Sequence, residues 1–263
     1  MAKIIFFGNG PLAEYTLPVL KKHHRVIFHA HSSADLAEVA KIKRSHPDAY
    51  GVLASFGVII KPDLLELFQP TGILNIHPSK LPEYRGPSPI ESAILDGATK
   101  FTVSIMQLVK AMDAGPTYHQ ITCPMPSPFT KDEVYRTLAT AGATWLAQNL
   151  TNLPTPIAQD EHQATYTAKL TKALSPLTPE TKSASRLLRE IIAYTGFPKS
   201  TYQFTNKSHQ ALDCIIHSAH LSTEPENALS LKCADGKYLT ADTLQPAGRK
   251  VMDAKSFING YLK

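Results

Sequence analysis

Residues 73–86 read Ile-Leu-Asn-Ile-His-Pro-Ser-Lys-Leu-Pro-Glu-Tyr-Arg-Gly, and this stretch decides how the first half of the chain is interpreted. Side chains of a β-strand repeat their direction every two residues, so a strand over residues 73–77 places Asn75 and His77 on one face. Pro78 disfavours a helical conformation at His77, and three further prolines before residue 90 prevent regular structure beyond it. The pair therefore lies where a strand opens into a stiff loop, the edge at which open α/β sheets bind ligands.

An acidic residue adds a third polar group near this edge. Asp113 stands in the loop Met-Asp-Ala-Gly-Pro at residues 112–116, directly after the strand-like residues 102–108. Taken alone, the Asn–His pair also has a structural explanation, because Asn is common in turns and a lone His is often a hydrogen-bonded structural residue. The acidic residue favours a catalytic role over a structural one, since Asn, His and Asp would converge from two adjacent strand ends.

Short apolar or β-rich runs alternate with helical candidates through the first 150 residues. The expected strands are residues 3–8, 25–30, 49–54, 73–77, 101–108 and 117–123, and the expected helices are residues 12–22, 34–45, 62–68, 89–96 and 131–150. Such alternation indicates βαβ units and a largely parallel sheet.

The composition and periodicity of the sequence change after Leu150. Prolines among Thr, Gln and Ser indicate a linker, an amphipathic helix is expected at residues 183–195, and the short strands after it are typical of a small barrel. We therefore expect an α/β fold in which a Rossmann-like, mostly parallel sheet domain is followed by a small C-terminal OB-like β-barrel domain. The expected bounds are 1–150 for the first domain, 151–179 for the linker and 180–263 for the barrel.

Composition excludes several classes of protein. A chain of 263 residues with 43% hydrophobic content is ordinary for a globular protein. No apolar run approaches the ~20 residues of a membrane span, and the N-terminus lacks a signal-peptide pattern, so we expect a cytoplasmic protein. Three scattered cysteines, Cys123, Cys214 and Cys233, predict reduced thiols.

The net charge of +5 is mild but unevenly distributed. Residues 169–207 hold seven Lys or Arg against two acidic residues, which weakly favours a nucleic-acid contact, although a solvated helix face explains it equally well. Gly-Asn-Gly at residues 8–10 partly fits a dinucleotide fingerprint, but the second strand ends without an acidic residue, so a plain glycine turn is favoured. The histidines form no metal-ligand spacing, and no metal is expected.

Together these residues resemble the methionyl-tRNA formyltransferase family over most of the chain. Residues 75–77 and 79–90 are similar to the signature of the wider folate-dependent formyltransferase superfamily. Residues 103–107 followed by Asp113-Ala114-Gly115 resemble the strand and loop that carry the family's Asp. Residues 166–170 resemble the entry into its C-terminal domain, and residues 244–252 resemble that domain's final signature, which is more specific to the tRNA enzyme.

The resemblance implies transfer of a formyl group from the co-substrate 10-formyltetrahydrofolate to the amino group of methionine on initiator methionyl-tRNA, for translation initiation. It implies catalytic roles for Asn75, His77 and Asp113. The folate would lie along Ser79, Lys80, Leu81 and Pro82, with a pterin pocket lined by Phe56, Gly57, Val58 and Ile59. The residues expected to bind the acceptor substrate are Arg85, Gly86, Arg186 and Arg189. We expect a monomer without a metal and without membrane association.

Formyl transfer to an amine passes through a tetrahedral carbon that bears an oxyanion. Asn75 could donate its amide hydrogens to that oxygen. His77 could carry a proton between the attacking amine and the departing folate nitrogen, or assist the oxyanion when charged. Asp113 could orient His77 or accept the amine proton through water.

The sequence departs from the family pattern in a few places. Lys80 replaces the usual Leu, Pro116 stands where the tRNA enzyme often has Asp, and Phe197 stands where Trp is common. The basic insert that usually follows the second strand is missing, because Ala30-His31 runs straight into Ser-Ser-Ala-Asp.

Two alternatives therefore stay open. A sugar-nucleotide N-formyltransferase shares the Asn–His–Asp chemistry and would explain the lost insert, but the C-terminal Leu-Gln-Pro-Ala-Gly signature counts against it. A non-catalytic RNA-binding relative would have kept the fold alone, but three intact catalytic positions count against that alternative.

Overall fold

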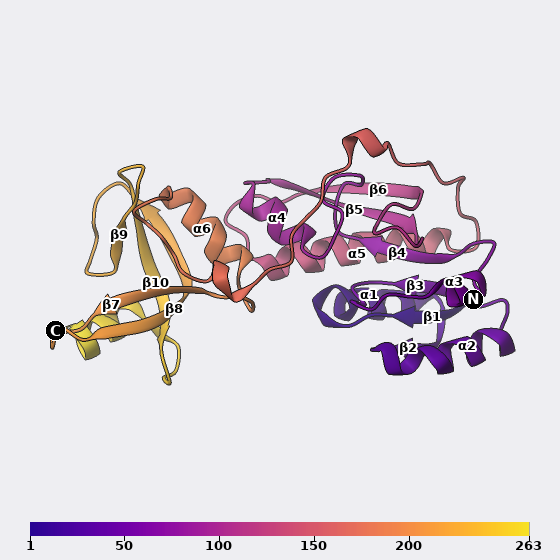
Figure 1. Cartoon of the computed structure of the whole chain (residues 1–263), viewed down its shortest axis with the longest axis horizontal. Helices are drawn as coiled ribbons and strands as arrows, with labels where there is room; N and C mark the ends of the chain where they lie inside the picture. Colours follow the sequence, from indigo (N-terminus) through magenta and orange to yellow (C-terminus); the bar gives the residue numbers. More distant parts are fainter. Residues whose placement is uncertain (263) are drawn as a thin grey trace. The chain divides into compact units, whose positions relative to one another are not determined.

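A computed structural model describes residues 1–262 (Figure 1). The chain divides into two compact units. The first comprises residues 1–93 and 98–168, and the second comprises residues 94–97 and the chain from Lys169 onward. Within the described residues, no helix is long and apolar enough to cross a membrane.

The first unit is built on a six-stranded sheet with the strand order β2-β1-β3-β4-β5-β6. The strands are β1 (Lys3–Phe7), β2 (Arg25–Ala30), β3 (Tyr50–Leu53), β4 (Ile73–His77), β5 (Lys100–Gln107) and β6 (Thr117–Pro124). The first four in this order pair in parallel, whereas β5 is antiparallel to both β4 and β6. The α/β class predicted from the sequence is confirmed, with an antiparallel hairpin along one side of the parallel strands.

Helices accompany this sheet, and one of them fixes the strand that carries the predicted site. The helices are α1 (Gly10–His23), α2 (Leu36–Ser45), α3 (Pro62–Glu66), α4 (Pro89–Leu95) and α5 (Lys131–Asn149). Helix α5 begins at a capping box, in which Thr130 and Glu133 each accept a hydrogen bond from the other's backbone N–H. At Gly142 it lies so close to β4 that an added Cβ would come within 2.9 Å of the Ile76 side chain. The side chain of Ile76 thus packs under α5.

Strand β4 is buried along its whole length. Ile73, Leu74 and Ile76 are fully buried, as are residues 4–7 of β1. Strands covered on both faces read as nearly continuous apolar runs, which is the pattern of β1. Strand β4 departs from this pattern at Asn75 and His77, and its burial holds these two polar residues in a rigid part of the sheet.

The turn between β1 and α1 requires glycine for close packing. A Cβ at Gly8 would collide with the Ala54 carbonyl oxygen and would lie 2.8 Å from the Ala13 side chain. Gly10 has a φ of +71°, a conformation that side chains other than glycine rarely adopt. Both glycines thus have a structural explanation, which agrees with the plain glycine turn favoured above.

The second unit is a curled antiparallel sheet of five strands. They are β7 (Ser200–Thr205), β8 (Ala211–Ser222), β9 (Ser230–Lys232), β10 (Tyr238–Pro246) and β11 (Met252–Asp253). The main order is β11-β10-β8-β7, and β9 pairs with β10. Register shifts between β8 and β10 bend the pair, as bulges do. The predicted barrel-like C-terminal unit is confirmed, in the form of a half-barrel.

One amphipathic helix covers the interior of this second sheet. Helix α6 (Ala184–Ala193) buries Leu187 and Ile191 against Phe204, Ile216 and other apolar residues. The unit ends with α7 (Ala254–Phe257) and a π-helical turn at Ile258–Leu262. The three cysteines are free thiols, and burial raises the pKa of the Cys214 thiol to about 11, so it behaves as an inert core residue.

The segment expected as a linker is shared between the two units. Residues 151–168 belong to the first unit, where Ile157 forms a β-bridge with Thr117 and Tyr166 forms one with Arg85. The residues from Lys169 belong to the second unit, where Pro176 bridges to Thr201. Most of this stretch is therefore fixed extended chain rather than a free connection.

Candidate active site

Strand β4 brings Asn75 and His77 to one face of the sheet at its carboxyl edge. Each residue is 5% exposed, and they lie opposite Met106 and Ser104 of β5. His77 Nε2 lies 3.3 Å from the Tyr84 carbonyl oxygen. The side-chain amide of Asn75 has no hydrogen-bond partner among the described residues. A nearly buried amide in this position is available to bind a ligand.

Asp113 reaches the same place from the loop between β5 and β6. Its backbone has a φ of +49°, and its Oδ2 accepts a 2.8 Å hydrogen bond from the Gly86 N–H. Its Oδ1 lies 3.7 Å from His77 Nδ1, and the two side chains are 15% and 6% exposed. The structure therefore brings His77 and Asp113 together, but not by the route predicted from two adjacent strand ends. Because β5 is antiparallel to β4, β5 ends beside the start of β4, and the loop after β5 carries Asp113 back to His77.

The main chain of residues 79–82 is held by hydrogen bonds from Ser104 and Gln120, two residues not predicted from the sequence to belong to the site. Ser104 Oγ donates a 2.6 Å hydrogen bond to Ser79 O and accepts one from Leu81 N. Gln120 Nε2 donates to Leu81 O at 2.6 Å and to Ser104 Oγ at 3.1 Å. Ser104 is fully buried, so this arrangement fixes the main chain of the predicted folate loop.

The side chains of the predicted folate loop lie in different environments. Ser79 and Leu81 are buried, whereas Pro82 is half-buried. Lys80 is exposed and forms a 3.0 Å ion pair with Glu83. The ammonium group of Lys80 is therefore on the outer side of the loop.

The residues predicted to line the pterin pocket follow β3 in an irregular loop. Phe56 is buried and contacts the ring of Phe7 edge to face at 5.6 Å. Gly57 has a φ of +68°, Val58 is half-buried, and Ile59 is 90% exposed. An isoleucine this exposed at the carboxyl edge of the sheet offers apolar surface to a ligand, whereas Phe56 supports the loop from the core.

Arg85 has no free donor for a substrate in this structure. It is 1% exposed, and its guanidinium donates to Gln159, Glu161 and the Tyr166 hydroxyl. These five hydrogen bonds match the five N–H groups of the side chain. The N–H of Gly86 is likewise taken by Asp113. The structure thus favours a supporting role for these two residues over the direct substrate contact expected from the sequence.

Arg186 and Arg189 make contacts within the second unit. Both donate to the Leu95 carbonyl oxygen, at 2.9 Å and 3.0 Å. Arg186 also forms a 3.1 Å ion pair with Glu190, which is 1% exposed. Their predicted binding of the acceptor stays a prediction, and these contacts give them a structural role in addition.

The polar residues that support the site give little or no signal in the sequence. Ser104 is a small polar residue inside an apolar strand, the one signal by which it could have been noticed. Gln159 lies in a stretch rich in Pro, Thr and Gln and donates to the Asp113 and Gly115 carbonyl oxygens. Only the folded chain brings it to the site.

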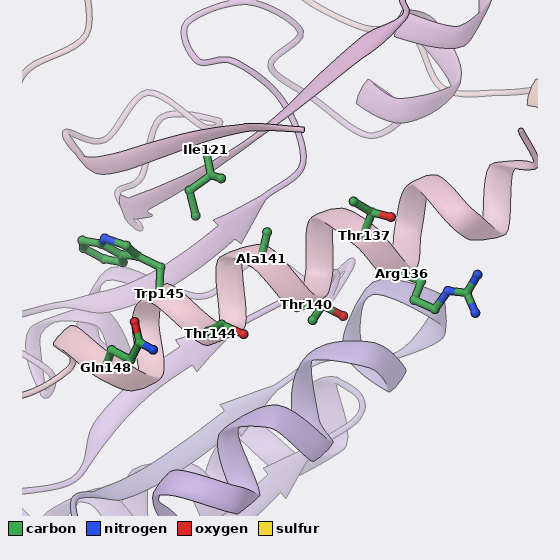
Figure 2. Close-up of a pocket in the computed structure, with 8 residues that line it drawn as sticks. All are labelled: Ile121, Arg136, Thr137, Thr140, Ala141, Thr144, Trp145 and Gln148. Atoms are coloured by element: carbon green, nitrogen blue, oxygen red, sulfur yellow. The ribbon is translucent and has the colours of Figure 1, made fainter. Parts of the chain in front are cut away.

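An open groove lies elsewhere on the first unit, between β6 and the outer face of α5. Its volume is about 590 Å³, and Figure 2 shows the lining residues, with Ile121 on β6 facing Ala141 on the helix. Trp145 at one end stacks on His119 at 4.7 Å. The groove contains none of the predicted site residues. Among the described residues, no group of three His, Cys, Asp or Glu could hold a metal ion.

The fold and the sequence are those of formyl transferases. The formyl transferase family matches residues 11–150, and the C-terminal domain of formyl transferases matches residues 180–262. A methionyl-tRNA formyltransferase from Roseiflexus castenholzii is 34% identical over 237 residues, which cover 86% of this chain and 74% of the relative. The chain therefore belongs to the formyl transferase family, with methionyl-tRNA formyltransferases among its relatives.

Solved structures agree on the fold. The methionyl-tRNA formyltransferase from Clostridium thermocellum matches with a TM-score of 0.69 at 17% identity, over 94% of this chain and 98% of that chain. HypX from Aquifex aeolicus in complex with tetrahydrofolic acid matches with a TM-score of 0.71 at 15% identity, over 98% of this chain and 47% of that chain. At such low identities these similarities establish the fold only.

Proposed function

We propose that this protein transfers a formyl group from 10-formyltetrahydrofolate to the α-amino group of methionine on initiator methionyl-tRNA, acting as a monomer. The observation that carries the proposal is that Asn75 and His77 share one face of β4, with Asp113 3.7 Å from His77, in a chain of the formyl transferase family. The relatives named methionyl-tRNA formyltransferase support the choice of acceptor.

The reaction balances without a covalent enzyme intermediate. The bond between the formyl carbon and the donor nitrogen breaks, a bond to the acceptor amine forms, and one proton moves from the amine to the donor nitrogen. Asn75 donates to the oxygen that gains charge, since its amide has no other partner among the described residues. His77 carries the proton, and Asp113, 3.7 Å from the imidazole, supplies a counter-charge to the protonated ring.

The donor-binding surface would be the fixed main chain of residues 79–82 together with the loop after β3. Ser104 and Gln120 hold the first loop rigid, so the donor meets a preorganised surface. Ile59 supplies exposed apolar area for an aromatic ring. The donor contributes the formyl carbon, and the chain contributes orientation and proton transfer.

One feature of the fold, the short connection after β2, supports a second candidate for the acceptor. Strand β2 ends at Ala30, and the 3₁₀ turn Ser33–Asp35 leads directly into α2. The connection between β2 and α2 is therefore short and contains no long basic insert. This short connection favours a sugar-nucleotide amine as the second candidate. An N-formyltransferase from Helicobacter canadensis, solved in complex with folinic acid and dTDP-3-aminofucose, has the same fold, with a TM-score of 0.66 at 16% identity.

One assay separates these acceptors. The purified chain is supplied with 10-formyltetrahydrofolate and either initiator methionyl-tRNA or amino-sugar nucleotides, and the formylated products are measured by mass spectrometry. We expect product with methionyl-tRNA. Product with amino-sugar nucleotides alone would replace the acceptor, and no product with either would refute formyl transfer to these amines. Asn75→Ala is the control for contaminating activity.

A further inference from the structure

The residues after α5 pack directly on the loop that carries Asp113. Gln159 Nε2 donates to Asp113 O at 2.8 Å and to Gly115 O at 2.6 Å. Its Oε1 accepts from Nε and Nη2 of Arg85 at 3.1 Å and 2.8 Å. A flipped amide would turn its oxygen toward two carbonyls and its NH₂ toward a guanidinium, so the orientation of Gln159 is fixed by its partners.

Arg85, which hydrogen-bonds Gln159, is itself fixed in place by other contacts. The guanidinium makes a bidentate pair with Glu161, with distances of 2.9 Å and 2.7 Å, and donates to the Tyr166 hydroxyl. Its backbone is paired on both sides, because Arg85 N donates to Thr165 O and Arg85 O accepts from Thr167 N, each at 2.8 Å. A planar, bidentate pair of this kind adds geometric specificity as well as energy.

The two ends of Asp113 are thereby held by one connected set of hydrogen bonds. Gln159 holds its main-chain carbonyl, and Gly86, the residue after Arg85, holds its carboxylate. The loop also sits tightly on β5, since a Cβ at Gly115 would collide with Gln107 O. We infer that Gln159 is a positioning residue that keeps the Asp113 carboxylate directed at His77; the inference rests on the proposed function for its catalytic consequence.

The first test replaces Gln159 by Met, which has similar length and no hydrogen-bonding amide. A displacement of about 1 Å at a catalytic group can cost on the order of 100-fold in rate, so we expect kcat to fall at least roughly 10-fold. KM for the formyl donor should stay within about twofold of the parent, since the loop of residues 79–82 has its own supports. Gln163→Met is the matched control, because Gln163 is exposed and its amide contacts only Asp160.

A second variant, Gln159→Glu, distinguishes loss of the Gln159 hydrogen bonds from misfolding of Gln159→Met. Gln159→Glu keeps an oxygen for Arg85 but cannot donate to the carbonyl oxygens of Asp113 and Gly115 when ionised. We expect it to fold and to lose kcat in the same direction as Gln159→Met. Parent-like kcat in both variants would overturn the inference.

Hydrogen exchange separates positioning from general stability and needs no activity. The Gly86 amide donates to Asp113, whereas the Ala54 amide donates to Phe7 O in the core of the same unit. In Gln159→Met we expect roughly 10-fold or faster exchange at Gly86 with unchanged exchange at Ala54. Unchanged exchange at Gly86, or equal acceleration at both amides, would overturn the inference. If the parent formylates no acceptor, the proposed function fails, and this comparison of amides decides the inference alone.

Discussion

His77 Nδ1 and Asp113 Oδ1 lie 3.7 Å apart, while the other oxygen of the same carboxylate accepts a 2.8 Å hydrogen bond from the Gly86 amide. The carboxylate is thus held by main chain on one side and faces the imidazole on the other. At this distance the carboxylate makes no hydrogen bond to the ring, but it offers a counter-charge when the ring takes up a proton. The arrangement suits a group that transfers a proton during each reaction cycle.

Replacing Asn75 by Ala should lower kcat by ~10²–10³ and leave donor affinity little changed, because the amide acts on charge that develops only late in the reaction. Steady-state kinetics and equilibrium binding of the donor measure the two quantities. Asn152→Ala, an exposed asparagine of the same unit, serves as the control. A folded Asn75→Ala enzyme with near-parent kcat would remove Asn75 from oxyanion stabilisation.

Replacing His77 by Ala should lower activity by roughly 10²–10⁴. His162→Ala, in which an exposed histidine is removed, is the control and should keep parent-like activity. Steady-state kinetics of the two variants measure kcat and kcat/KM. A folded His77→Ala enzyme with parent-like kcat/KM would assign the proton transfer to another group.

Replacing Ser104 by Ala should act on the formyl donor. The change leaves Ser79 O and Leu81 N without their buried partner, which costs ~1–3 kcal/mol, and it loosens the loop of residues 79–82. We expect KM for the donor to rise about three- to tenfold with kcat nearly intact. Thr102→Val is the control on the same strand, since the Thr102 hydroxyl has Thr122 as its one hydrogen-bond partner in the described part of the chain. Equal KM for the donor in Ser104→Ala and Thr102→Val would contradict the role of Ser104.

The sequence predicts the site well where a local rule suffices. The two-residue period of a strand places Asn75 and His77 on one face, and β4 has the expected bounds. The direction of β5 follows no such rule, because the segment with α4 that joins it to β4 resembles a parallel crossover, yet the strands pair antiparallel. Gln159 and Arg85 meet across a long stretch of chain, and neither composition nor periodicity carries information about that contact.

The second unit should be more stable at mildly acidic than at alkaline pH because of His220. Hydrogen bonds to Asp242 and then Glu226, at 2.7 Å and 2.9 Å, raise the pKa of His220 above its ordinary value. The stabilisation is fully present below the ordinary value near ~6.5 and is lost as the pH rises through the raised folded-state value. These side chains are 42–47% exposed, so the effect is about 1 kcal/mol or less.

Thermal or urea unfolding at pH 5.5 and pH 8.5, roughly one unit below and two above the ordinary histidine value, tests this expectation. In His220→Gln the difference in unfolding midpoint between the two pH values should shrink. His217→Gln on the same strand is the control, since His217 faces the Gln245 amide and has no carboxylate partner within residues 1–262. An equal pH dependence in His220→Gln and the parent would exclude His220 as its source.

Binding of tRNA should depend on exposed lysines at the start of the second unit. Arg186 is a poor probe, because its reversal to Glu would place a second carboxylate beside the buried Glu190. Lys169 and Lys172 are exposed, and no ion pair with a carboxylate is found for either among the described residues. Phosphate contacts contribute affinity that falls with salt and carry little sequence information.

Neutralising both residues, as Lys169→Gln with Lys172→Gln, should therefore raise KM for methionyl-tRNA and leave kcat nearly intact. The slope of log KM against log salt should fall by about 0.9 for each phosphate that the variant no longer neutralises. Lys21→Gln with Lys22→Gln is the matched control, since these exposed lysines end α1, at the edge of the sheet opposite to the site. Equal KM and equal salt slope in the two double variants would exclude the lysines from the tRNA surface. If the parent shows no salt-dependent KM for methionyl-tRNA, the short connection after β2 reflects a change of acceptor, and the amino-sugar nucleotides become the substrates to pursue.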